Sequence, residues 1–440
     1  MPVFKSDRWK SPVDDAKGAR HVPDNHSPQD RLEEATGLAE AIDLDVAGSL
    51  IIPIGAPRPS TLIGSGKVEE IKDLVAERKV DLVIVDHTIT PGQQKALETI
   101  WKAKVLDRTG LILEIFGSRA KTREGVLQVE LAHLTYQKGR LVRAWTHLER
   151  QRGGAGFLGG PGEAQIELDR RMLQDRIDAI KKDLIDVVRT RELHRAGRRK
   201  VPYPIVAIVG YTNAGKSTLF NRVTGAGVLA MDQVFATLDP TMREVKLPTG
   251  RKIILSDTVG FISDLPTTLV AAFRATLEEV IEADLILHVR NIAHAETTAQ
   301  ARDVAGVLKD LGIDVHAADA AVIEVWNKAD LLSDEARSQI SRDARFTTRL
   351  PQLVSALTGE GIDGLLVAID EHFGANDIIV AVRIPAEDGK LLHWLHEHTD
   401  VIERQANDDD GVITVRVRVA ADKRDRLMSQ VHTAGAEIIA

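Results

Sequence analysis

One nine-residue stretch combines the residue types and the spacing that bind phosphate. It has a glycine, four further residues, a second glycine, a lysine and a hydroxyl residue. Glycine lets the backbone approach an anion closely, the lysine ammonium neutralises phosphate charge, and the hydroxyl is a ligand for Mg²⁺. We therefore predict that a phosphate-binding loop is formed by Gly210, Tyr211, Thr212, Asn213, Ala214, Gly215, Lys216, Ser217 and Thr218.

The residues on either side of this loop are those that would position it. Residues 205–209 are an apolar, β-branched run that predicts a buried strand, and residues 217–224 read as the first turns of a helix. Backbone N–H groups and the dipole at a helix N-terminus favour an anion. The order of strand, loop and helix favours a phosphate site over a chance glycine turn.

A second segment with metal-binding chemistry follows the loop. Residues 253–257 form an apolar strand that ends on Asp257, whose carboxylate would join the Mg²⁺ shell. The N–H of Gly260 would bind the γ-phosphate. We predict nucleotide contacts by Asp257, Thr258, Val259 and Gly260.

Between these two segments, a threonine should coordinate Mg²⁺ and sense the γ-phosphate. Thr237 and Thr241 both fit, and we favour Thr237. The predicted metal ligands are therefore Ser217, Thr237 and Asp257, and the predicted catalytic residues are Lys216, Thr237 and Gly260. The segment around the threonine would contact the nucleotide through Phe235, Ala236, Thr237, Leu238 and Asp239.

Two later segments favour guanine over adenine. The carboxylate of Asp330 can accept hydrogen bonds from the guanine N1–H and 2-amino group, whereas adenine would leave that carboxylate unpaired. Asn327 would tie this segment to the phosphate loop, and the Lys328 stem would cover the base. A backbone N–H after the strand at 350–354 would bind the guanine oxygen. The predicted base-binding residues are Asn327, Lys328, Ala329, Asp330, Ser355, Ala356 and Leu357.

Length and composition set the context for this site. The 440 residues predict two to four domains. With no cysteine, the chain has no disulfide, thiol catalysis or cysteine-ligated zinc, and it suits a reducing cytoplasm. Residues 1–17 lack the apolar core of a signal peptide, and no apolar run is long enough to span a membrane. We expect a cytoplasmic protein that is monomeric in solution.

Composition and hydrophobic periodicity divide the chain into five parts. Residues 1–38 are polar and expected to be disordered, and residues 39–121 predict a small α/β domain with a mostly parallel sheet. Its expected strands are 47–54, 80–85 and 111–116, with further strand signal at Val105, and its expected helices are 68–78 and 91–101. Residues 64–67 resemble a second phosphate loop but lack the four-residue spacing, so we expect a turn before a helix there.

Residues 122–200 predict a basic helical hairpin. Leu173, Ile177, Ile180, Leu184 and Val187 repeat at fours and threes, as in a packed helical seam. The two helices are separated by residues 152–162, which include six glycines and an apolar Phe-Leu pair. Lysine and arginine exceed acidic residues by seven over 138–200, although the whole chain has a net charge of −8. A flexible linker with solvated helix faces and an RNA-contacting surface both fit these features.

The last two parts are a P-loop domain and a small terminal domain. Residues 201–374 predict a mostly parallel sheet with a hairpin at 243–256 and strands at 284–289 and 321–326. Residues 375–440 predict a small α+β domain. His393, His396 and His398 in that domain read as solvated residues of an amphipathic helix and not as a metal site.

These motifs resemble the HflX family of translation-factor-class P-loop GTPases. The resemblance rests on the phosphate loop, on residues 235–240 and 257–262, and on the glycine-rich loop at 153–163 with the segment at 64–67. It implies hydrolysis of GTP to GDP and phosphate in the cytoplasm. It also implies that the protein binds the large ribosomal subunit and its RNA in the GTP state, and separates or rescues stalled ribosomes.

The residue after Gly260 bears on how hydrolysis would occur. Phe261 stands where a Ras-like GTPase has glutamine, and an apolar side chain cannot orient the attacking water. We expect slow intrinsic hydrolysis, assisted in trans or by K⁺ at Asn213, where similar GTPases ligate this ion. Two other hypotheses stay open: an RNA-binding protein in which GTP only locks a conformation, and a GTPase that assembles a protein complex without RNA.

Overall fold

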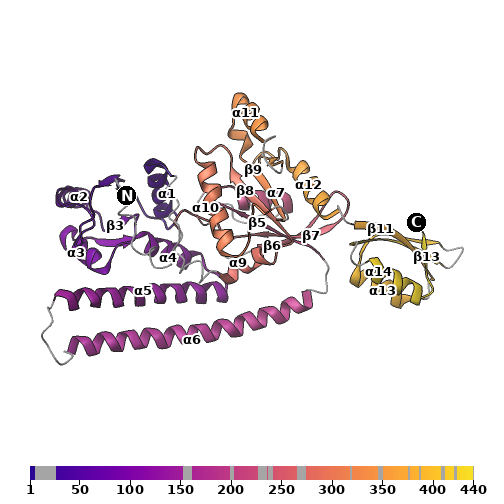
Figure 1. Cartoon of the computed structure of the whole chain (residues 1–440), viewed down its shortest axis with the longest axis horizontal. Helices are drawn as coiled ribbons and strands as arrows, with labels where there is room; N and C mark the ends of the chain where they lie inside the picture. The colour runs from indigo at the N-terminus through magenta and orange to yellow at the C-terminus, as the bar shows by residue number, and fades with distance from the viewer. Residues whose placement is uncertain are drawn as a thin grey trace.

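The structure is a computed structural model, which describes residues 1–4, 26–151, 161–198, 203–225, 235, 241–264, 274–317, 320–344, 350–374, 377–385, 388–407, 412–420 and 424–439. Thr237 and residues 152–160 of the glycine-rich loop therefore lie outside the described residues. Figure 1 shows an elongated molecule. The N-terminal and C-terminal parts lie at its opposite ends, and the largest sheet lies between them. No helix in the described ranges is long and apolar enough to cross a membrane.

The N-terminal part contains short parallel strands and helices. Strands β1 and β2 pair with each other, and β3 and β4 form a second two-stranded parallel sheet. The elements are β1 (Pro2–Phe4), α1 (Pro28–Glu40), β2 (Ile52–Ile54), α2 (Ser65–Arg78), β3 (Leu82–Val85), α3 (Pro91–Trp101), β4 (Lys104–Asp107) and α4 (Arg108–Arg119). Gly64 is the residue before α2, as expected of a turn that leads into a helix.

The expectation that residues 1–38 are disordered is wrong for α1. Ser27 caps this helix by accepting a hydrogen bond from the N–H of Asp30 at 3.1 Å, and Pro28 occupies its first turn. Leu38 is fully buried, so the helix packs on the rest of the chain through its apolar end. The many charged residues of α1 hid this local signal.

The expectation of a strand at 111–116 is also wrong, because these residues lie in α4. Asp107 caps that helix through the N–H of Gly110 at 2.8 Å. A short apolar run does not distinguish a buried strand from a buried helix. Here the run is apolar on every side because α4 is buried on several faces, with exposures of 2% or less at Leu111, Ile112, Leu113, Ile115 and Phe116.

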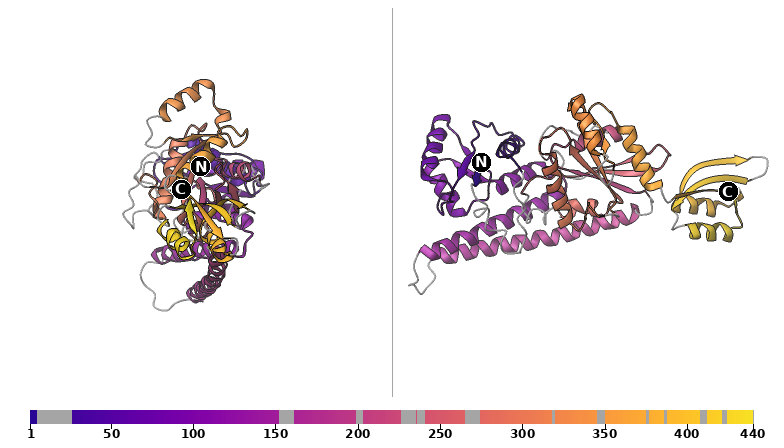
Figure 2. Two further views of the ribbon diagram at one scale, coloured as in Figure 1. Left: turned by 90° about the vertical axis from the view of Figure 1, so that its right-hand side faces the viewer. Right: turned by 45° about the horizontal axis from the view of Figure 1, so that its top comes forward.

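Two long helices form the predicted hairpin. Helix α5 (Arg123–Gln151) and helix α6 (Pro161–Arg198) lie side by side in both Figure 1 and the right view of Figure 2, beneath the N-terminal part and the central sheet. Ile177 and Ile180 of the expected seam are buried. The opposite faces of α6 are exposed, including Leu168, Met172 and Ile185.

In the part of the chain that the structure describes, the central sheet has six strands in the order β10-β9-β8-β5-β7-β6. All neighbours are parallel except the hairpin of β6 and β7. The strands are β5 (Ile205–Gly210), β6 (Thr241–Lys246), β7 (Lys252–Asp257), β8 (Leu285–Asn291), β9 (Val322–Asn327) and β10 (Gln352–Leu353). Helices α7 (Lys216–Thr224), α9 (Arg274–Ile281), α10 (Thr297–Asp310), α11 (Asp334–Ala344) and α12 (Ile362–Gly374) flank them.

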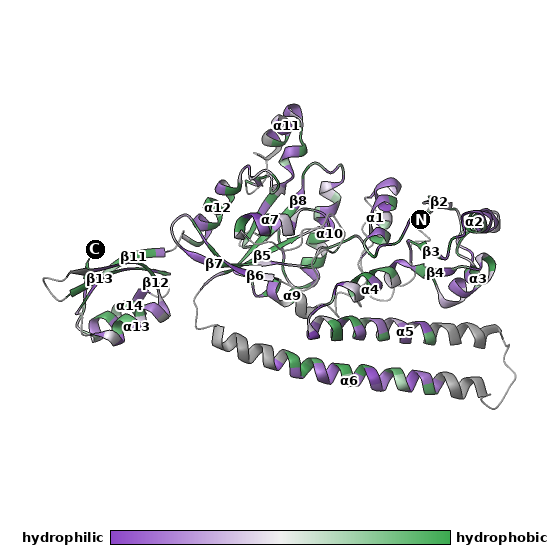
Figure 3. Cartoon of the chain, turned by 180° about the vertical axis from the view of Figure 1, so that it is seen from behind, coloured by the Kyte–Doolittle hydropathy of each residue, from purple (hydrophilic) through white to green (hydrophobic). Residues whose placement is uncertain are grey.

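Strand β5 shows why this sequence makes a covered parallel sheet. Val206 and Ile208 belong to one buried apolar cluster, and Ala207 and Val209 belong to another, so both faces of the strand are buried. The cluster that contains Val209 also includes Phe116 of α4, which joins the N-terminal part to the sheet. Figure 3 shows the apolar colour along these central strands.

The described residues of the C-terminal part form a separate antiparallel sheet with two helices. Its strands are β11 (Asp377–Pro385), β12 (Asp400–Asn407), β13 (Val412–Ala420) and β14 (Glu437–Ile439), in the order β12-β13-β11-β14. Helices α13 (Gly389–His398) and α14 (Arg424–Thr433) carry apolar residues into its core. Within the described residues, no group of three or more potential ligands could hold a metal ion, and His398 stacks on Trp394.

Candidate nucleotide-binding site

The glycine loop lies between β5 and α7, at the carboxyl edge of the sheet. Gly215 has φ +87°, a conformation that favours glycine, and a Cβ there would collide with the side-chain amide of Asn327. A Cβ on Gly210 would collide with the carbonyl of Val289 on the neighbouring strand. The two glycines are therefore required by close packing as well as by the turn.

Lys216 is buried at the start of α7. Its Nζ donates to the carbonyl of Tyr211 at 2.7 Å. Burial lowers the pKa of Lys216 to about 8, although Asp257 opposes this shift. A buried ammonium with so little compensating charge is suited to an anionic ligand.

Ser217 and Asp257 are brought together from the two segments predicted to hold Mg²⁺. The Ser217 Oγ donates to Asp257 Oδ2 at 2.7 Å. Hydroxyl and carboxylate oxygens are hard ligands of the kind that Mg²⁺ prefers, so the pair fits this ion. Thr258 points elsewhere, since its Oγ1 donates to the carbonyl of Ile208 on β5 at 2.6 Å.

The segment after Asp257 pairs with the phosphate loop. The N–H of Thr212 donates to the carbonyl of Phe261 at 2.7 Å, and the N–H of Phe261 donates to the carbonyl of Gly210 at 3.1 Å. Phe261 is buried, with 1% of its surface exposed. A Cβ on Gly260 would lie 3.0 Å from Lys216 Nζ, which places Gly260 directly beside the buried ammonium.

Asn327 ties the predicted base-binding segments to the phosphate loop. Its Nδ2 donates to the carbonyl of Ala214 at 2.9 Å, and its Oδ1 accepts from the N–H of Ala356 at 2.9 Å. The Ser355 Oγ donates to Asp330 Oδ1 at 2.6 Å. The structure thus brings together segments that lie more than 100 residues apart in the chain.

Two further predicted residues have contacts that sequence alone did not reveal. Lys328 Nζ donates to Asn213 Oδ1 at 3.2 Å, so the asparagine proposed for K⁺ faces an ammonium here. Phe235 is buried and packs edge-to-face against Phe116 of α4, with ring centroids 4.6 Å apart. Val259 is buried in the same apolar cluster as Phe116 and Phe235. The structure does not describe Ala236, Thr237, Leu238 and Asp239.

Sequence reasoning missed a polar network that connects the N-terminal part to this site. Tyr211 donates its hydroxyl hydrogen to Glu34 of α1 and accepts from the N–H of Ser263 at 2.7 Å. Arg108 is buried and binds Glu34, Asp86 and the Ser263 carbonyl. These partners are too far apart in the chain for any local pattern to predict their contact.

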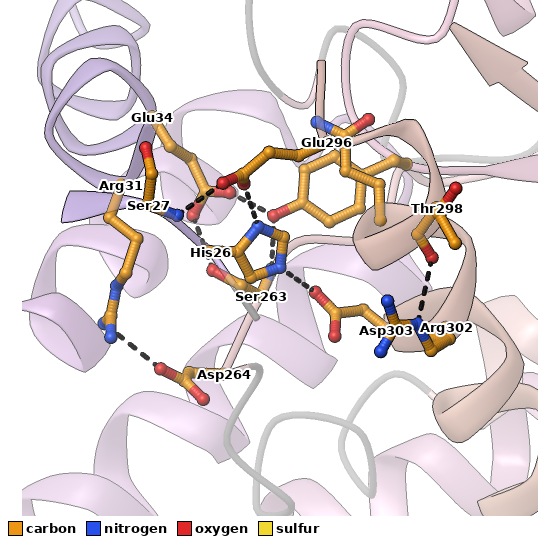
Figure 4. Close-up of polar contacts among 12 residues, drawn as sticks. His26, Ser27, Arg31, Glu34, Ser263, Asp264, Glu296, Thr298, Arg302 and Asp303 are labelled. Atoms are coloured by element: carbon orange, nitrogen blue, oxygen red, sulfur yellow. Dashed lines mark hydrogen bonds and ion pairs between the residues drawn. The ribbon is translucent and has the colours of Figure 1, made fainter. Parts of the chain in front are cut away.

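A second set of contacts fastens the N-terminal part to α10. His26 bonds Glu296 at 2.5 Å and Asp303 at 2.7 Å. The hydrogen bond to Asp303 is the main cause that raises the pKa of His26 to about 9. Figure 4 shows these side chains together with Arg31, which pairs with Asp264 at 3.2 Å just beyond Ser263. The N-terminal part therefore contacts the loop that follows Gly260.

The fold and this site define a P-loop GTPase. Three features of this class meet at one edge of the sheet. They are the glycine loop between a central parallel strand and a helix, the acid at the end of the adjacent strand, and the segment from Asn327 to Asp330 that is tied to the glycine loop. Comparison with known proteins then identifies the family within this class.

Four family models match consecutive parts of the chain. They are described as GTP-binding GTPase N-terminal (29–117), GTP-binding GTPase middle region (119–198), 50S ribosome-binding GTPase (205–328) and HflX C-terminal domain (343–436). Two relatives are both called GTPase HflX. That of Magnetococcus marinus is 47% identical and covers 92% of each chain, and that of Escherichia coli K12 is 44% identical and covers 91% of this chain and 92% of its own. The chain belongs to the HflX family of GTPases.

Family membership confirms several predictions. The protein is an enzyme that binds GTP and hydrolyses it, and its fold is the predicted α/β P-loop fold. The match over 343–436 extends the family resemblance through the C-terminal sheet. The roles of the individual site residues remain predictions.

Proposed function

We propose that this GTPase binds the large ribosomal subunit in its GTP state, and that it separates or rescues stalled ribosomes. The observation that carries this proposal is the match of residues 205–328 to a family described as 50S ribosome-binding GTPase. Binding in the cytoplasm through ribosomal RNA accords with the excess of lysine and arginine at 138–200. Phosphate contacts by such residues give affinity through counterion release.

In the proposed site, the chain holds GTP at both ends. Lys216 binds the β- and γ-phosphates, and the Gly260 N–H binds the γ-phosphate, because the two groups are adjacent. Asp330 accepts from the guanine N1–H and 2-amino group, supported by Ser355. Asn327 keeps these two halves in register through its bonds to Ala214 and Ala356.

Ser217 and Asp257 hold Mg²⁺ in this proposal, and Thr237 completes the ligand set. When bound, Mg²⁺ neutralises charge that develops on the β- and γ-phosphate oxygens. Asp257 also accepts from the Ser217 hydroxyl, which orients both groups toward the same point. K⁺ at Asn213 would assist in the same way, since Phe261 is buried and cannot orient water.

The decisive experiment compares GTP hydrolysis by the full chain with and without purified large subunits. We expect subunits to raise the rate and added salt to reduce that stimulation. A variant that lacks residues 153–162 should keep intrinsic hydrolysis but lose stimulation and any separation of subunits. Full stimulation without the loop would show that it is only a linker, and no stimulation of the parent would contradict the proposed function.

A further inference from the structure

Arg222 binds two successive carbonyl groups of the loop that follows β10. Its Nε donates to the Ala356 carbonyl at 3.0 Å, and its Nη2 donates to the Leu357 carbonyl. Arg222 lies in the last turn of α7, where the helix dipole also favours a cation. The same helix begins at Lys216, about 9 Å away along the axis at 1.5 Å per residue. One rigid element therefore carries the phosphate lysine and the arginine that holds this loop.

The geometry of the peptide group gives these contacts a consequence. The Ala356 carbonyl and the Leu357 N–H belong to one planar peptide, and in a trans peptide the two groups point in opposite directions. By holding the carbonyl, Arg222 sets the direction of the Leu357 N–H. The Ala356 N–H is not available for a ligand, because it already donates to Asn327 Oδ1 at 2.9 Å.

Neighbouring contacts place this peptide at the proposed base-binding end of the site. Ser355, which precedes it, donates to Asp330 Oδ1 at 2.6 Å. Leu357 is 69% exposed, so burial of its apolar side chain does not hold the loop in place. The polar bonds of Arg222 and Asn327 position the backbone instead.

We propose that Arg222 is a positioning residue for base recognition, which aims the Leu357 N–H at the 6-oxo oxygen of guanine. This inference rests on the proposed role of Asp330, which reads the N1–H and the 2-amino group on the same edge of the base. The charged guanidinium also polarises the peptide that it binds, which strengthens the N–H as a donor. In ATP, the 6-amino group of adenine would face the Leu357 N–H, and both groups are hydrogen-bond donors. The contact would be repulsive and would add to the discrimination against ATP.

The test measures dissociation constants of the full chain for three diphosphates that differ at one atom or group. GDP has the 6-oxo oxygen, inosine diphosphate keeps it but lacks the 2-amino group, and 6-thio-GDP replaces it by sulfur, a weak acceptor. We expect Arg222→Ala to weaken GDP and inosine diphosphate equally, by about tenfold, the equivalent of about 1.4 kcal/mol. It should weaken 6-thio-GDP by less than about twofold, since the bond that Arg222 supports is already poor in that ligand.

Two further variants separate this role from a general effect on the loop. Arg222→Lys keeps the charge but cannot span two carbonyls, so its loss of GDP affinity should be intermediate. Arg337→Ala is the matched control, because Arg337 holds the Ala329 carbonyl at 2.8 Å and pairs with Glu360 without touching the 356–357 peptide. Any loss in that variant should be equal for GDP and 6-thio-GDP, which share the N1–H and the 2-amino group and differ only at the 6-position.

Equal weakening of GDP, inosine diphosphate and 6-thio-GDP by Arg222→Ala would overturn the proposal and leave Arg222 a structural anchor. The role of Asp330 is tested separately, by asking whether Asp330→Asn shifts preference from GDP to xanthosine diphosphate. Failure of that shift would contradict the proposed base site, whereas its success combined with equal weakening by Arg222→Ala would contradict only the role of Arg222.

Discussion

The backbone N–H of Thr212 donates to the carbonyl of Phe261 at 2.7 Å. This bond joins the phosphate loop to the segment that follows Asp257, and it occupies one N–H of the loop that surrounds the phosphates. In the proposed site the γ-phosphate lies between Lys216 and Gly260, directly beside this pairing. GTP and GDP should therefore differ in how they affect the segment, because only GTP carries the third phosphate.

Gly260→Ala should reduce GTP binding by about tenfold or more and change GDP binding little. The added Cβ would lie 2.8 Å from Thr212 Cγ2 and 3.0 Å from Lys216 Nζ, so it displaces groups beside the γ-phosphate position. Fluorescent-nucleotide titrations would measure both affinities. Gly306→Ala serves as the control, because its Cβ meets nothing within 4 Å. Equal loss of GTP and GDP affinity in Gly260→Ala would contradict this assignment.

Nucleotide binding should take up protons above neutral pH. Burial lowers the pKa of Lys216 to about 8, and phosphate would raise it again by stabilising the charged form. At pH 8 the uptake should be about half a proton, and at pH 7 about a tenth. Nucleotide affinity should accordingly fall as pH rises above 8. The folded pKa lies below the unfolded value of 10.5, so burial of this group costs stability at neutral pH, and that cost decreases as pH rises from 8 to 10.5.

Calorimetry in buffers with different ionisation enthalpies would measure this uptake. Lys246→Met removes an exposed ammonium on β6, outside the proposed nucleotide site, and should leave the uptake unchanged. If uptake at pH 8 is absent in the parent protein, Lys216 does not titrate on binding.

Local chemistry explains which parts of this fold the sequence could predict. The phosphate loop is a contiguous motif between an apolar strand and a helix, and α3 has a proline at its start, so both could be located from their own residues. Asn327 and Asp330 lie at and just after the end of a strand whose last residues before Asn327 are apolar, so they could be located in the same way. In each case the required signal lies within about ten residues.

Long-range contacts explain what the sequence could not predict. Arg108 binds Glu34 and Ser263, which are 74 and 155 residues away, and a buried arginine is expected only once its partners are known. Phe235 is predicted from the sequence to contact the nucleotide, yet its ring packs against Phe116. Such pairings depend on how the N-terminal part meets the sheet, and no spacing along the chain encodes that arrangement.

Asp330→Asn should reverse base preference. The carboxamide can no longer accept two hydrogen bonds from guanine, but it can donate to the 2-oxo group of xanthine. GTP affinity should fall by about a hundredfold and xanthosine triphosphate affinity should rise. Asp334→Asn, on the first turn of α11, is the matched control. Unchanged GTP affinity in Asp330→Asn would rule out Asp330 as the guanine reader.

Hydrolysis should be faster in K⁺ than in Na⁺ at the same ionic strength. K⁺ at Asn213 would have to replace the Lys328 ammonium, which donates to Asn213 Oδ1 at 3.2 Å. Asn213→Ala should remove the difference between the two salts, because it removes the ligand oxygen. Phosphate release would be measured for both proteins in both salts. Equal rates in the parent protein would contradict a K⁺ site.

Tyr211→Phe should loosen the segment after Phe261 and shift binding toward GTP. The hydroxyl accepts from the Ser263 N–H at 2.7 Å and donates to Glu34, so its loss leaves a buried N–H unsatisfied, at a cost of about 1–3 kcal/mol. The cost falls on the arrangement in which this segment pairs with the phosphate loop. An arrangement that admits the γ-phosphate should therefore gain population.

Hydrogen exchange and nucleotide titration together would test this shift. In Tyr211→Phe, amides of 261–264 should exchange faster, and the ratio of GTP to GDP affinity should rise by about fivefold or more. Tyr136→Phe is the matched control, since its hydroxyl also donates to a carboxylate, that of Asp107 at 2.6 Å, and its other hydrogen-bond partner is Arg140. That variant should leave both measurements unchanged. If Tyr211→Phe speeds exchange without changing the affinity ratio, the pairing of Tyr211 with Ser263 stabilises the segment but does not select between nucleotides.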